Sequence, residues 1–380
     1  MGEVNIAEGG SKDAVAEGSQ GLKDAATPEA AQADKEARGD LKESKDFARQ
    51  VSRETTTTEA KQEESMMEKL RHRFGIENQL FKEILAEFFC TGLLLFWGDS
   101  SVAQLVVSNR MTNEWVALTI SWGVALWMSV QMSIRISGAH LNPAVSFFLF
   151  TQKKITFRKF VIFSIAQTAG AFCGALGVFV LWYDGINHFD GGKRQVKGMF
   201  ATAGIFATYP KPYLTIAGGI VDQIFGTAIL CLGVATITDK RNGIPPFLQP
   251  ACIGFLLVGI GTAFAHNCGY AINPARDLGP RLLTLCVGYG WETFSYNEYG
   301  YFWIPIICPM IGAALGAWLY EFVIGFHLPE AQTYQVCKVE ERESGGADRT
   351  FKKADQSPSH TSNSDIRQDS KETDKLIRKL

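Results

Sequence analysis

Asn-Pro-Ala occurs twice in this chain, each time in an apolar stretch too short to cross a bilayer. The first copy is Asn142-Pro143-Ala144, and the second is Asn273-Pro274-Ala275. Proline needs no amide donor in the first turn of a helix, and asparagine before it is a favoured N-cap. Two half-helices that begin at these asparagines would aim two positive dipole ends and two side-chain amides at one point. This arrangement predicts a pore for a small, neutral, polar solute.

By composition the 380 residues divide into three segments. Residues 1–80 and 328–380 are polar and charged and cannot bury enough apolar surface to fold, so we expect two disordered tails. Residues 81–327 are rich in apolar and aromatic side chains and are long enough for one membrane domain. The mean hydropathy of +0.02 is an average over these unlike parts. The net charge of −2 comes with no basic stripe bearing interleaved aromatics, so no nucleic-acid partner is predicted.

The chain carries no residue pattern typical of an enzyme or a metal site. It has no nucleophile elbow and no phosphate-binding glycine loop. Its eight cysteines form no C-x-x-C pair and no His/Cys metal spacing. We therefore expect no catalysis, no cofactor, no metal and no disulfide framework.

Apolar runs of about 20 residues predict membrane-spanning helices. Non-helical backbone at membrane depth is tolerated only where it is buried in protein or lines a watery cavity, so the two Asn-Pro-Ala stretches are expected to be re-entrant. The predicted fold class is an all-α membrane protein with six transmembrane helices and two re-entrant half-helices in an inverted repeat. The expected spans are Lys82–Val107, Trp115–Ile136, Lys159–Tyr183, Leu214–Thr238, Phe247–Ala265 and Tyr301–Ile324, and the half-helices are Asn142–Phe150 and Asn273–Val287.

Six spans return the chain to its starting side, and the distribution of lysine and arginine indicates which side that is. Basic residues gather before the first, third and fifth spans, for instance Lys82, Lys153 and Lys240. Two of the three connections on the opposite side contribute only Arg110. We expect a multi-pass protein of the cell membrane with both termini in the cytoplasm.

The two halves of the membrane domain repeat one another. Glu87 stands 55 residues before Asn142, and Asp222 stands 51 residues before Asn273. Each half holds three spans, so the second half is inserted upside down and the half-helices meet near the bilayer midplane. Intramembrane acids generally pair internally, so Glu87 and Asp222 are expected to accept hydrogen bonds from loop backbone rather than bind solute.

Small residues also recur at matching places in the two halves. Gly170-Ala171-Phe172-Cys173-Gly174 lies late in the first half, and Gly312-Ala313-Ala314-Leu315-Gly316 lies late in the second. Such small-residue faces allow helix backbones to approach closely in a membrane. We therefore expect one close helix contact in each half.

With these motifs, the chain resembles the major intrinsic protein family and, within it, the glycerol-conducting branch, the aquaglyceroporins. The resemblance covers about residues 80–328. It rests on the paired Asn-Pro-Ala motifs, on Ser137-Gly138-Ala139-His140 before the first, and on Arg276-Asp277 after the second. It implies six tilted helices and two half-helices around a pore in each subunit, assembled as a homotetramer in the lipid bilayer.

The resemblance further implies four residues at the narrowest, extracellular part of the pore, the selectivity filter. Arg276 matches the family's arginine, Trp122 matches the aromatic of the second span, and Tyr270 is an aromatic in keeping with glycerol channels. Gly261 stands where water-selective members carry a histidine, so it widens the constriction. Two rings and one cation would form an amphipathic slot that suits a polyol.

At the centre of the pore, Asn142 and Asn273 are expected to donate side-chain amides to the passing solute. The two dipole ends, Arg276 and the desolvation penalty of a narrow pore would oppose protons and cations. Asp277 either helps to shape the filter or supports the half-helix by complementing its dipole. Backbone carbonyls expected to accept hydrogen bonds from the solute are those of Gly138, Ala139, His140, Leu141, Gly269, Ala271 and Ile272.

The sequence thus predicts a passive channel for glycerol and other small uncharged solutes, with urea as a further candidate, that also conducts water and excludes ions and protons. A water-selective channel is the closest alternative, and Gly261 and Tyr270 argue against it. A non-conducting junction protein on the same scaffold is suggested only by the long tails and the external loop. An ion-coupled transporter would need midplane acids, and the half-helices carry none facing their asparagine tips.

Arg135, near the end of the second span, departs from the family pattern, which has a small or neutral residue there. A long basic side chain can snorkel to the interface. It can also line the inner vestibule of a pore. The sequence leaves both positions open.

Overall fold

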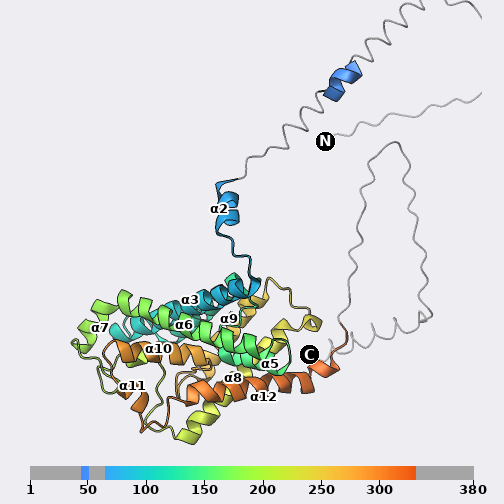
Figure 1. Ribbon diagram of the computed structural model, residues 1–380. Coiled ribbons are helices and arrows are strands. Elements are labelled where there is room, and N and C mark those ends of the chain that lie inside the picture. The colour runs from blue at the N-terminus through green and yellow to red at the C-terminus, as the bar shows by residue number, and fades with distance from the viewer. Residues whose placement is uncertain (1–43, 51–64, 331–380) are drawn as a thin grey trace, which may run out of the picture.

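The computed structural model describes residues 44–50 and 65–330. No β-strand occurs among these residues, and most of them form one bundle of helices that lie side by side (Figure 1). The long helices are α3 (Gln79–Val107), α4 (Trp115–Ser133), α6 (Phe157–Leu181), α8 (Ile216–Thr238), α9 (Gln249–Phe264) and α12 (Ile304–Val323), and the two shorter ones between them are α5 (Pro143–Thr151) and α10 (Pro274–Cys286). The remaining elements are α2 (Met66–Phe74), α7 (Tyr183–Asp190), η1 (Ala203–Ile205), η2 (Lys240–Asn242), α11 (Glu292–Ser295) and η3 (Gly325–His327).

Each predicted span corresponds to one long helix, and each predicted half-helix to a short one. The fold class predicted from the apolar runs is confirmed. The shortest of the six is α9, whose 16 residues rise about 24 Å at ~1.5 Å per residue. Four of the helices are both long and apolar enough to cross a membrane, namely Trp115–Ser133, Phe157–Leu181, Ile216–Thr238 and Ile304–His327.

Helix α2 lies within residues 1–80, the segment whose composition predicts disorder. Its start is closed by a capping box, in which Ser65 Oγ accepts from the backbone amide of Glu68 at 3.2 Å and Glu68 Oε2 accepts from that of Ser65 at 2.8 Å. None of its nine residues is buried, so the cap and not a core supports this helix. Residues 44–50 of the same segment are also helical, and residues 1–43, 51–64 and 331–380 of the two predicted tails lie outside the described residues.

The closest helix contacts occur once in each half of the bundle. Helix α3 packs along α6, and α8 packs along α12. A Cβ atom on Gly174 would overlap the carbonyl of Gly92, and one on Gly316 would overlap the carbonyl of Ala228. These glycines come from the two small-residue faces of the sequence, and they let backbone touch backbone. The matching contacts identify the two halves as structural counterparts.

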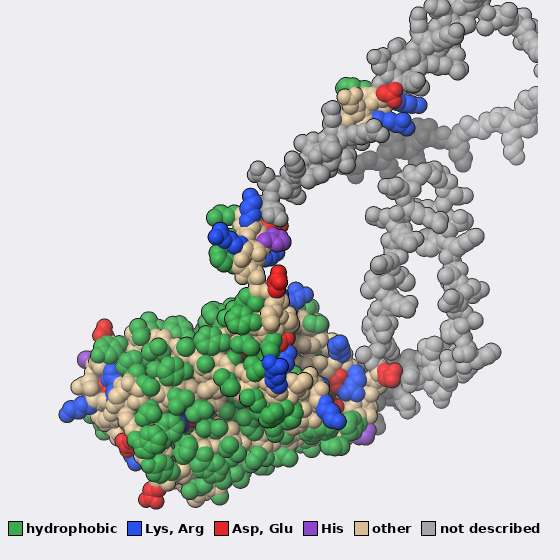
Figure 2. Space-filling view, viewed as in Figure 1, with side chains coloured by type: hydrophobic (Ala, Val, Ile, Leu, Met, Phe, Trp, Pro, Cys, Tyr) green, Lys and Arg blue, Asp and Glu red, His purple; other side chains and the backbone are tan. Residues whose placement is uncertain are grey.

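The outside of the bundle is apolar between its two ends. Figure 2 shows hydrophobic side chains spread over the visible face, with charged side chains towards the ends. Phe89, Ile165, Phe225, Phe255 and Leu315 are more than half exposed. A continuous apolar surface of this kind is rare on a soluble monomer. It suits the hydrocarbon core of a bilayer.

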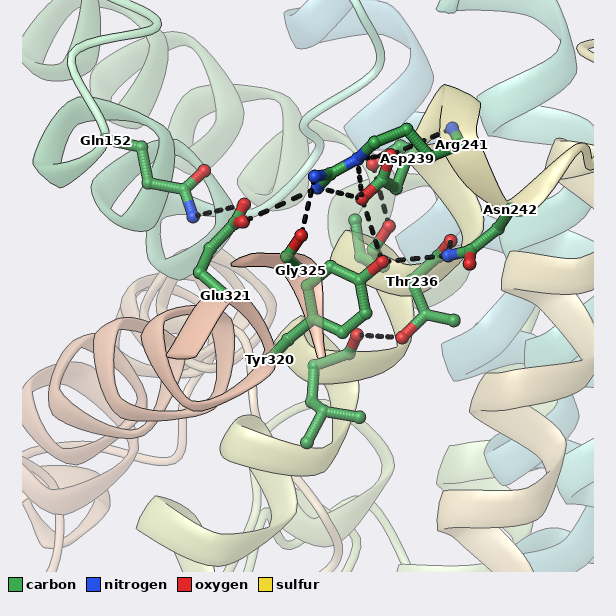
Figure 3. Close-up of polar contacts among 11 residues, drawn as sticks. Gln152, Thr236, Asp239, Arg241, Asn242, Tyr320, Glu321 and Gly325 are labelled. Atoms are coloured by element: carbon green, nitrogen blue, oxygen red, sulfur yellow. Dashed lines mark hydrogen bonds and ion pairs between the residues drawn. The ribbon is translucent and has the colours of Figure 1, made fainter. Parts of the chain in front are cut away.

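A polar cluster at the end of the bundle near α2 joins the α8–α9 connection to the end of α12 (Figure 3). Asp239 accepts from Arg241 Nε at 2.9 Å and from the hydroxyl of Tyr320 at 2.9 Å. Arg241 also donates to the backbone carbonyl of Gly325 at 2.5 Å. The hydrogen bond from Arg241 lowers the pKa of Asp239 to about 2, so this carboxylate is ionised at neutral pH. The cluster therefore holds the connection in place under ordinary conditions.

Substitution of Gly316 by alanine tests the helix contact of the second half. The added methyl group overlaps the Ala228 carbonyl, and such overpacking typically costs about 1–3 kcal/mol. We expect Gly316→Ala to lower the midpoint of thermal denaturation of the purified protein. The midpoint is measured from the protein that remains in the size-exclusion peak after heating to increasing temperatures. The matched control is Gly259→Ala in α9, where a Cβ meets nothing within 4 Å. Equal midpoints for the two variants would contradict the contact.

Candidate functional site

The two half-helices begin in the same way. Asn142 is the N-cap of α5, and its Oδ1 accepts from the backbone amide of Ala144 at 2.8 Å. Asn273 is the N-cap of α10, and its Oδ1 accepts from the backbone amide of Ala275 at 3.0 Å. In both, the proline of the motif occupies the first turn, where no amide hydrogen is required. Each asparagine therefore keeps its side-chain NH2 group for a partner outside its own helix.

That partner is the backbone of the other half. Asn142 Nδ2 donates to the carbonyl of Ile272 at 3.0 Å, and Asn273 Nδ2 donates to the carbonyl of Leu141 at 2.9 Å. The two half-helices therefore meet tip to tip. An amide NH2 group carries two hydrogens, so each asparagine retains one donor that these bonds do not use. Leu141 and Ile272 each use one lone pair of the carbonyl oxygen on these bonds and keep the second.

Two loops lead into the half-helices: the first loop, residues 134–142, and the second loop, residues 265–273. Ala139 and Leu141 have φ of 54° and 52°, and Tyr270 and Ile272 have φ of 39° in both cases. Residues with side chains rarely adopt this left-handed region, and each costs on the order of 1–3 kcal/mol. The strained residues stand one and three positions before each asparagine. The two loops thus share one unusual backbone path.

Glu87 holds the first loop in this path. Its Oε1 accepts from the Ser137 hydroxyl at 2.5 Å and from the His140 amide at 2.9 Å. Its Oε2 accepts from the Leu141 amide at 2.7 Å and from Gln167 Nε2 at 2.8 Å. The carboxylate is fully buried, and each of its oxygens accepts two hydrogen bonds. It therefore contacts loop backbone.

In the second half, the loop backbone is held by Gln223 and not by Asp222. Gln223 Oε1 accepts from the amide of Ile272 at 2.9 Å. Asp222 accepts from the side chains of Asn267 and Cys268, both at 2.9 Å. The structural counterpart of Glu87 is therefore Gln223, one residue after the Asp222 that the sequence repeat indicated. A neutral amide fills the position where the first half has a carboxylate, so a pattern of acidic residues does not indicate it.

Two cavities approach the constriction from opposite ends of the bundle. The first, the asparagine cavity, has a volume of about 400 Å³ and extends to Lys154 near the α2 end. The second, the glycine cavity, has a volume of about 540 Å³ and extends to Arg110 at the other end. The expected loop residues line them, with Gly138, Ala139, His140, Leu141, Ala271 and Ile272 in the asparagine cavity and Gly269 in the glycine cavity.

Three residues line both cavities: Trp122, Tyr270 and Arg276. Asn142 and Asn273 line the asparagine cavity only. The position where the two cavities meet is therefore formed by three of the four residues predicted for the filter. The fourth, Gly261, lines the glycine cavity.

The constriction combines one guanidinium with aromatic walls. Arg276 Nη1 donates to the backbone carbonyl of Phe206 at 2.8 Å, and its guanidinium carbon lies 4.7 Å from the centre of the Trp122 ring. A Cβ atom on Gly261 would lie 2.9 Å from Cγ2 of Thr119 and 3.0 Å from Cζ of Tyr270. Any side chain at Gly261 would therefore press on both Thr119 and the Tyr270 ring. The glycine keeps this part of the passage open.

Asp277 is buried behind the constriction and lines neither cavity. It accepts from the backbone amide of Thr208 at 2.9 Å and from Arg281 Nε at 2.8 Å. Arg281 is fully buried and also donates to the carbonyls of Thr208 and Thr293 at 2.6 and 2.8 Å. Of the two roles predicted for Asp277, this geometry favours support. The pair fixes the segment that carries Phe206.

Arg135 is exposed and does not line the asparagine cavity. Of the two positions open to it from sequence, the geometry favours the interface. Among residues 44–50 and 65–330, no group of three or more His, Cys, Asp or Glu side chains is placed to hold a metal ion.

The chain is similar in sequence and in structure to known proteins. Residues 76–320 match the family model described as major intrinsic protein. The chain is 42% identical over 267 residues to Aquaporin-10 of Milnesium tardigradum, covering 67% of this chain and 65% of that protein. It is 41% identical over 259 residues to Aquaporin-9 of Mus musculus, covering 68% and 88%. The X-ray structure of the aquaglyceroporin from Plasmodium falciparum is similar with a TM-score of 0.59 at 30% identity, covering 64% of this chain and 97% of that one.

Replacement of Glu87 by glutamine tests how the first loop is held. Glutamine has the same shape, but its NH2 group would face donors that now meet a carboxylate oxygen. An unsatisfied buried donor costs about 1–3 kcal/mol, so we expect a clearly lower thermal midpoint for the purified protein.

The same substitution one turn earlier in α3, Glu83→Gln, is the control. Glu83 forms an ion pair with Lys159 at 2.8 Å near the surface, and such pairs contribute about 0–1 kcal/mol. If the two variants melt alike, Glu87 does not hold the loop.

Proposed function

The chain belongs to the major intrinsic protein family, and we propose that it is a passive channel for glycerol and other small uncharged solutes that also conducts water. It is a channel and not an enzyme. The observation that carries this proposal is the meeting of two cavities, one from each end of the bundle, at Trp122, Tyr270 and Arg276. The predicted family and the predicted channel function are thereby supported by both the comparisons and the geometry.

A polyol can exchange its water shell for groups along this passage. Asn142 and Asn273 each retain one amide hydrogen, and the carbonyls of residues such as Gly138, Ala139 and Ala271 accept. At the constriction, the hydroxyl edge of the solute faces Arg276 while its C–H edge lies against the rings. Binding groups that replace hydration without holding the solute tightly permit both entry and exit.

Charged solutes meet two barriers in the same passage. The N-termini of α5 and α10 point their positive dipole ends at the asparagine cavity, which disfavours cations. Arg276 adds a guanidinium at the constriction, and removal of an ion from water is costly in a narrow apolar space. The channel therefore excludes ions and protons.

The width at Gly261 favours glycerol over a strictly water-selective channel. The missing side chain leaves room next to Tyr270 that a histidine would fill. The similarity to a solved aquaglyceroporin, whose name refers to glycerol, supports the same choice. Urea is a further candidate solute because it is small, neutral and polar.

We also propose the setting of the channel. The apolar outer surface belongs in a cell membrane, and the family resemblance suggests a homotetramer. Residues 81–327 form the channel domain. The basic residues Lys82, Lys153 and Lys240 precede the first, third and fifth spans. By the positive-inside rule, the end of the bundle that carries these residues faces the cytoplasm, together with both terminal tails.

Swelling of lipid vesicles tests the transport proposal. Vesicles that contain the full chain are placed in an inward gradient of glycerol, and the change in volume is followed by light scattering. Glycerol-driven swelling above that of empty vesicles is expected. Water flux without glycerol flux would identify a water-selective channel, and no flux of either would identify a non-conducting member of the family.

Gly261→His tests the filter itself. The imidazole would press on Tyr270 and narrow the passage, so glycerol permeability should fall by about tenfold or more while water permeability is retained, because each ~1.4 kcal/mol of added barrier slows passage tenfold. Gly259→His in the same helix is the control, since a Cβ there meets nothing within 4 Å. Unchanged glycerol flux in Gly261→His, with the variant present at normal abundance, would remove Gly261 from the filter.

A further inference from the structure

An acidic side chain is buried directly beside the constriction. Asp99 lies within α3 and has no exposed surface. Neither of its carboxylate oxygens has a hydrogen-bond partner among the described residues. Its Oδ1 lies 3.7 Å from Nη1 of Arg276, within ion-pair distance. An intramembrane acid is expensive, and such residues commonly mark the pathway of a solute or ion.

The backbone of α3 passes immediately behind the filter aromatic. A Cβ atom on Gly98 would lie 2.5 Å from the ring of Trp122. The same ring carries the Arg276 guanidinium on its face. Asp99 is the next residue of the helix, so its carboxylate and the Trp122 ring approach the same guanidinium. Arg276 is thus in contact with a backbone carbonyl, an aromatic face and a carboxylate.

The other charges nearby are already engaged. Asp277, which follows Arg276 in the chain, pairs with Arg281 at 2.8 Å. Arg281 uses its remaining groups on backbone carbonyls of Thr208 and Thr293. Arg276 is therefore the one cation within ion-pair distance of Asp99 among the described residues. A buried carboxylate without a cation would be strongly disfavoured, so the two residues depend on each other.

We infer that Asp99 is a specificity-determining residue of this channel, because its carboxylate balances the charge of Arg276 and holds the guanidinium against Trp122. This inference rests on the proposed function. With its counter-ion in place, the guanidinium offers hydrogen-bond donors to a polyol while the carboxylate balances part of its charge. Cation exclusion then depends on keeping both members of the pair, since loss of the arginine alone leaves a buried carboxylate beside the constriction without its counter-ion.

A double-mutant cycle on the two residues tests the inference. Arg276→Val should open the space of the guanidinium to water, so that Asp99 keeps its charge at the widened passage, and should produce a cation conductance, measured as sodium flux into vesicles. Adding Asp99→Asn should reduce this conductance by about tenfold, because the attracting charge is gone while the widened passage remains. Equal sodium flux in the single and double variants would overturn the inference.

Asp99→Asn alone gives the second readout. Without its counter-ion the guanidinium turns towards the passage to be solvated, so the ratio of glycerol to water permeability should fall several-fold. An unchanged ratio would also overturn the inference. Ser100→Ala, the neighbouring position in α3, removes a polar group without changing charge and should leave the ratio as it is in the unmodified chain.

Two measures keep the outcomes distinct. Each variant is checked for a monodisperse size-exclusion peak, and Arg276→Gln replaces Arg276→Val in the cycle if the valine variant fails this check. Sodium flux does not depend on glycerol passage. A chain that passes no glycerol, but whose cycle behaves as described, would refute the proposed solute while leaving the role of Asp99 intact. A chain that passes glycerol, but whose single and double variants pass sodium equally, would refute the role of Asp99 while leaving the proposed solute intact.

Discussion

The whole arrangement depends on one reciprocal contact, in which each half-helix asparagine donates to the backbone of the opposite loop. The two bonds, at 3.0 and 2.9 Å, join parts of the chain that lie in different halves of the bundle. They fix where the two helix dipoles point. The strained backbone at Leu141 and Ile272 supplies the two acceptors, so local strain is used to bring the halves together.

The helices were predictable from sequence because their physical requirement is simple. A bilayer demands about 20 apolar residues per span, and the predicted Leu214–Thr238 became α8, Ile216–Thr238. Proline and asparagine likewise marked the starts of α5 and α10 to the residue. Helix α7 was not predicted, because an eight-residue amphipathic helix in a long connection carries no comparable length signal.

Most residues of the site could be predicted from the motifs and the family resemblance, but their partners could not. Phe206 binds Arg276 through its backbone carbonyl, so its side chain gives no signal. Gln223 was missed because the second half uses an amide where the first uses the Glu87 carboxylate. Asp99 is visible in sequence as an acid within an apolar span, but only the fold shows that its neighbour is the filter arginine. Residue type suggests a chemical role, whereas partners separated widely along the chain require coordinates.

The reciprocal contact has a consequence for biosynthesis. Asn142 and its acceptor are 130 residues apart, and Asn273 and its acceptor are 132 residues apart. At a translation rate of ~5–20 residues per second, the first loop emerges roughly 7–26 seconds before its partner exists. During that interval its asparagine lacks the bond that completes it. The first half therefore precedes the contact that completes it, and the two half-helices can meet only after residue 273 has been synthesised.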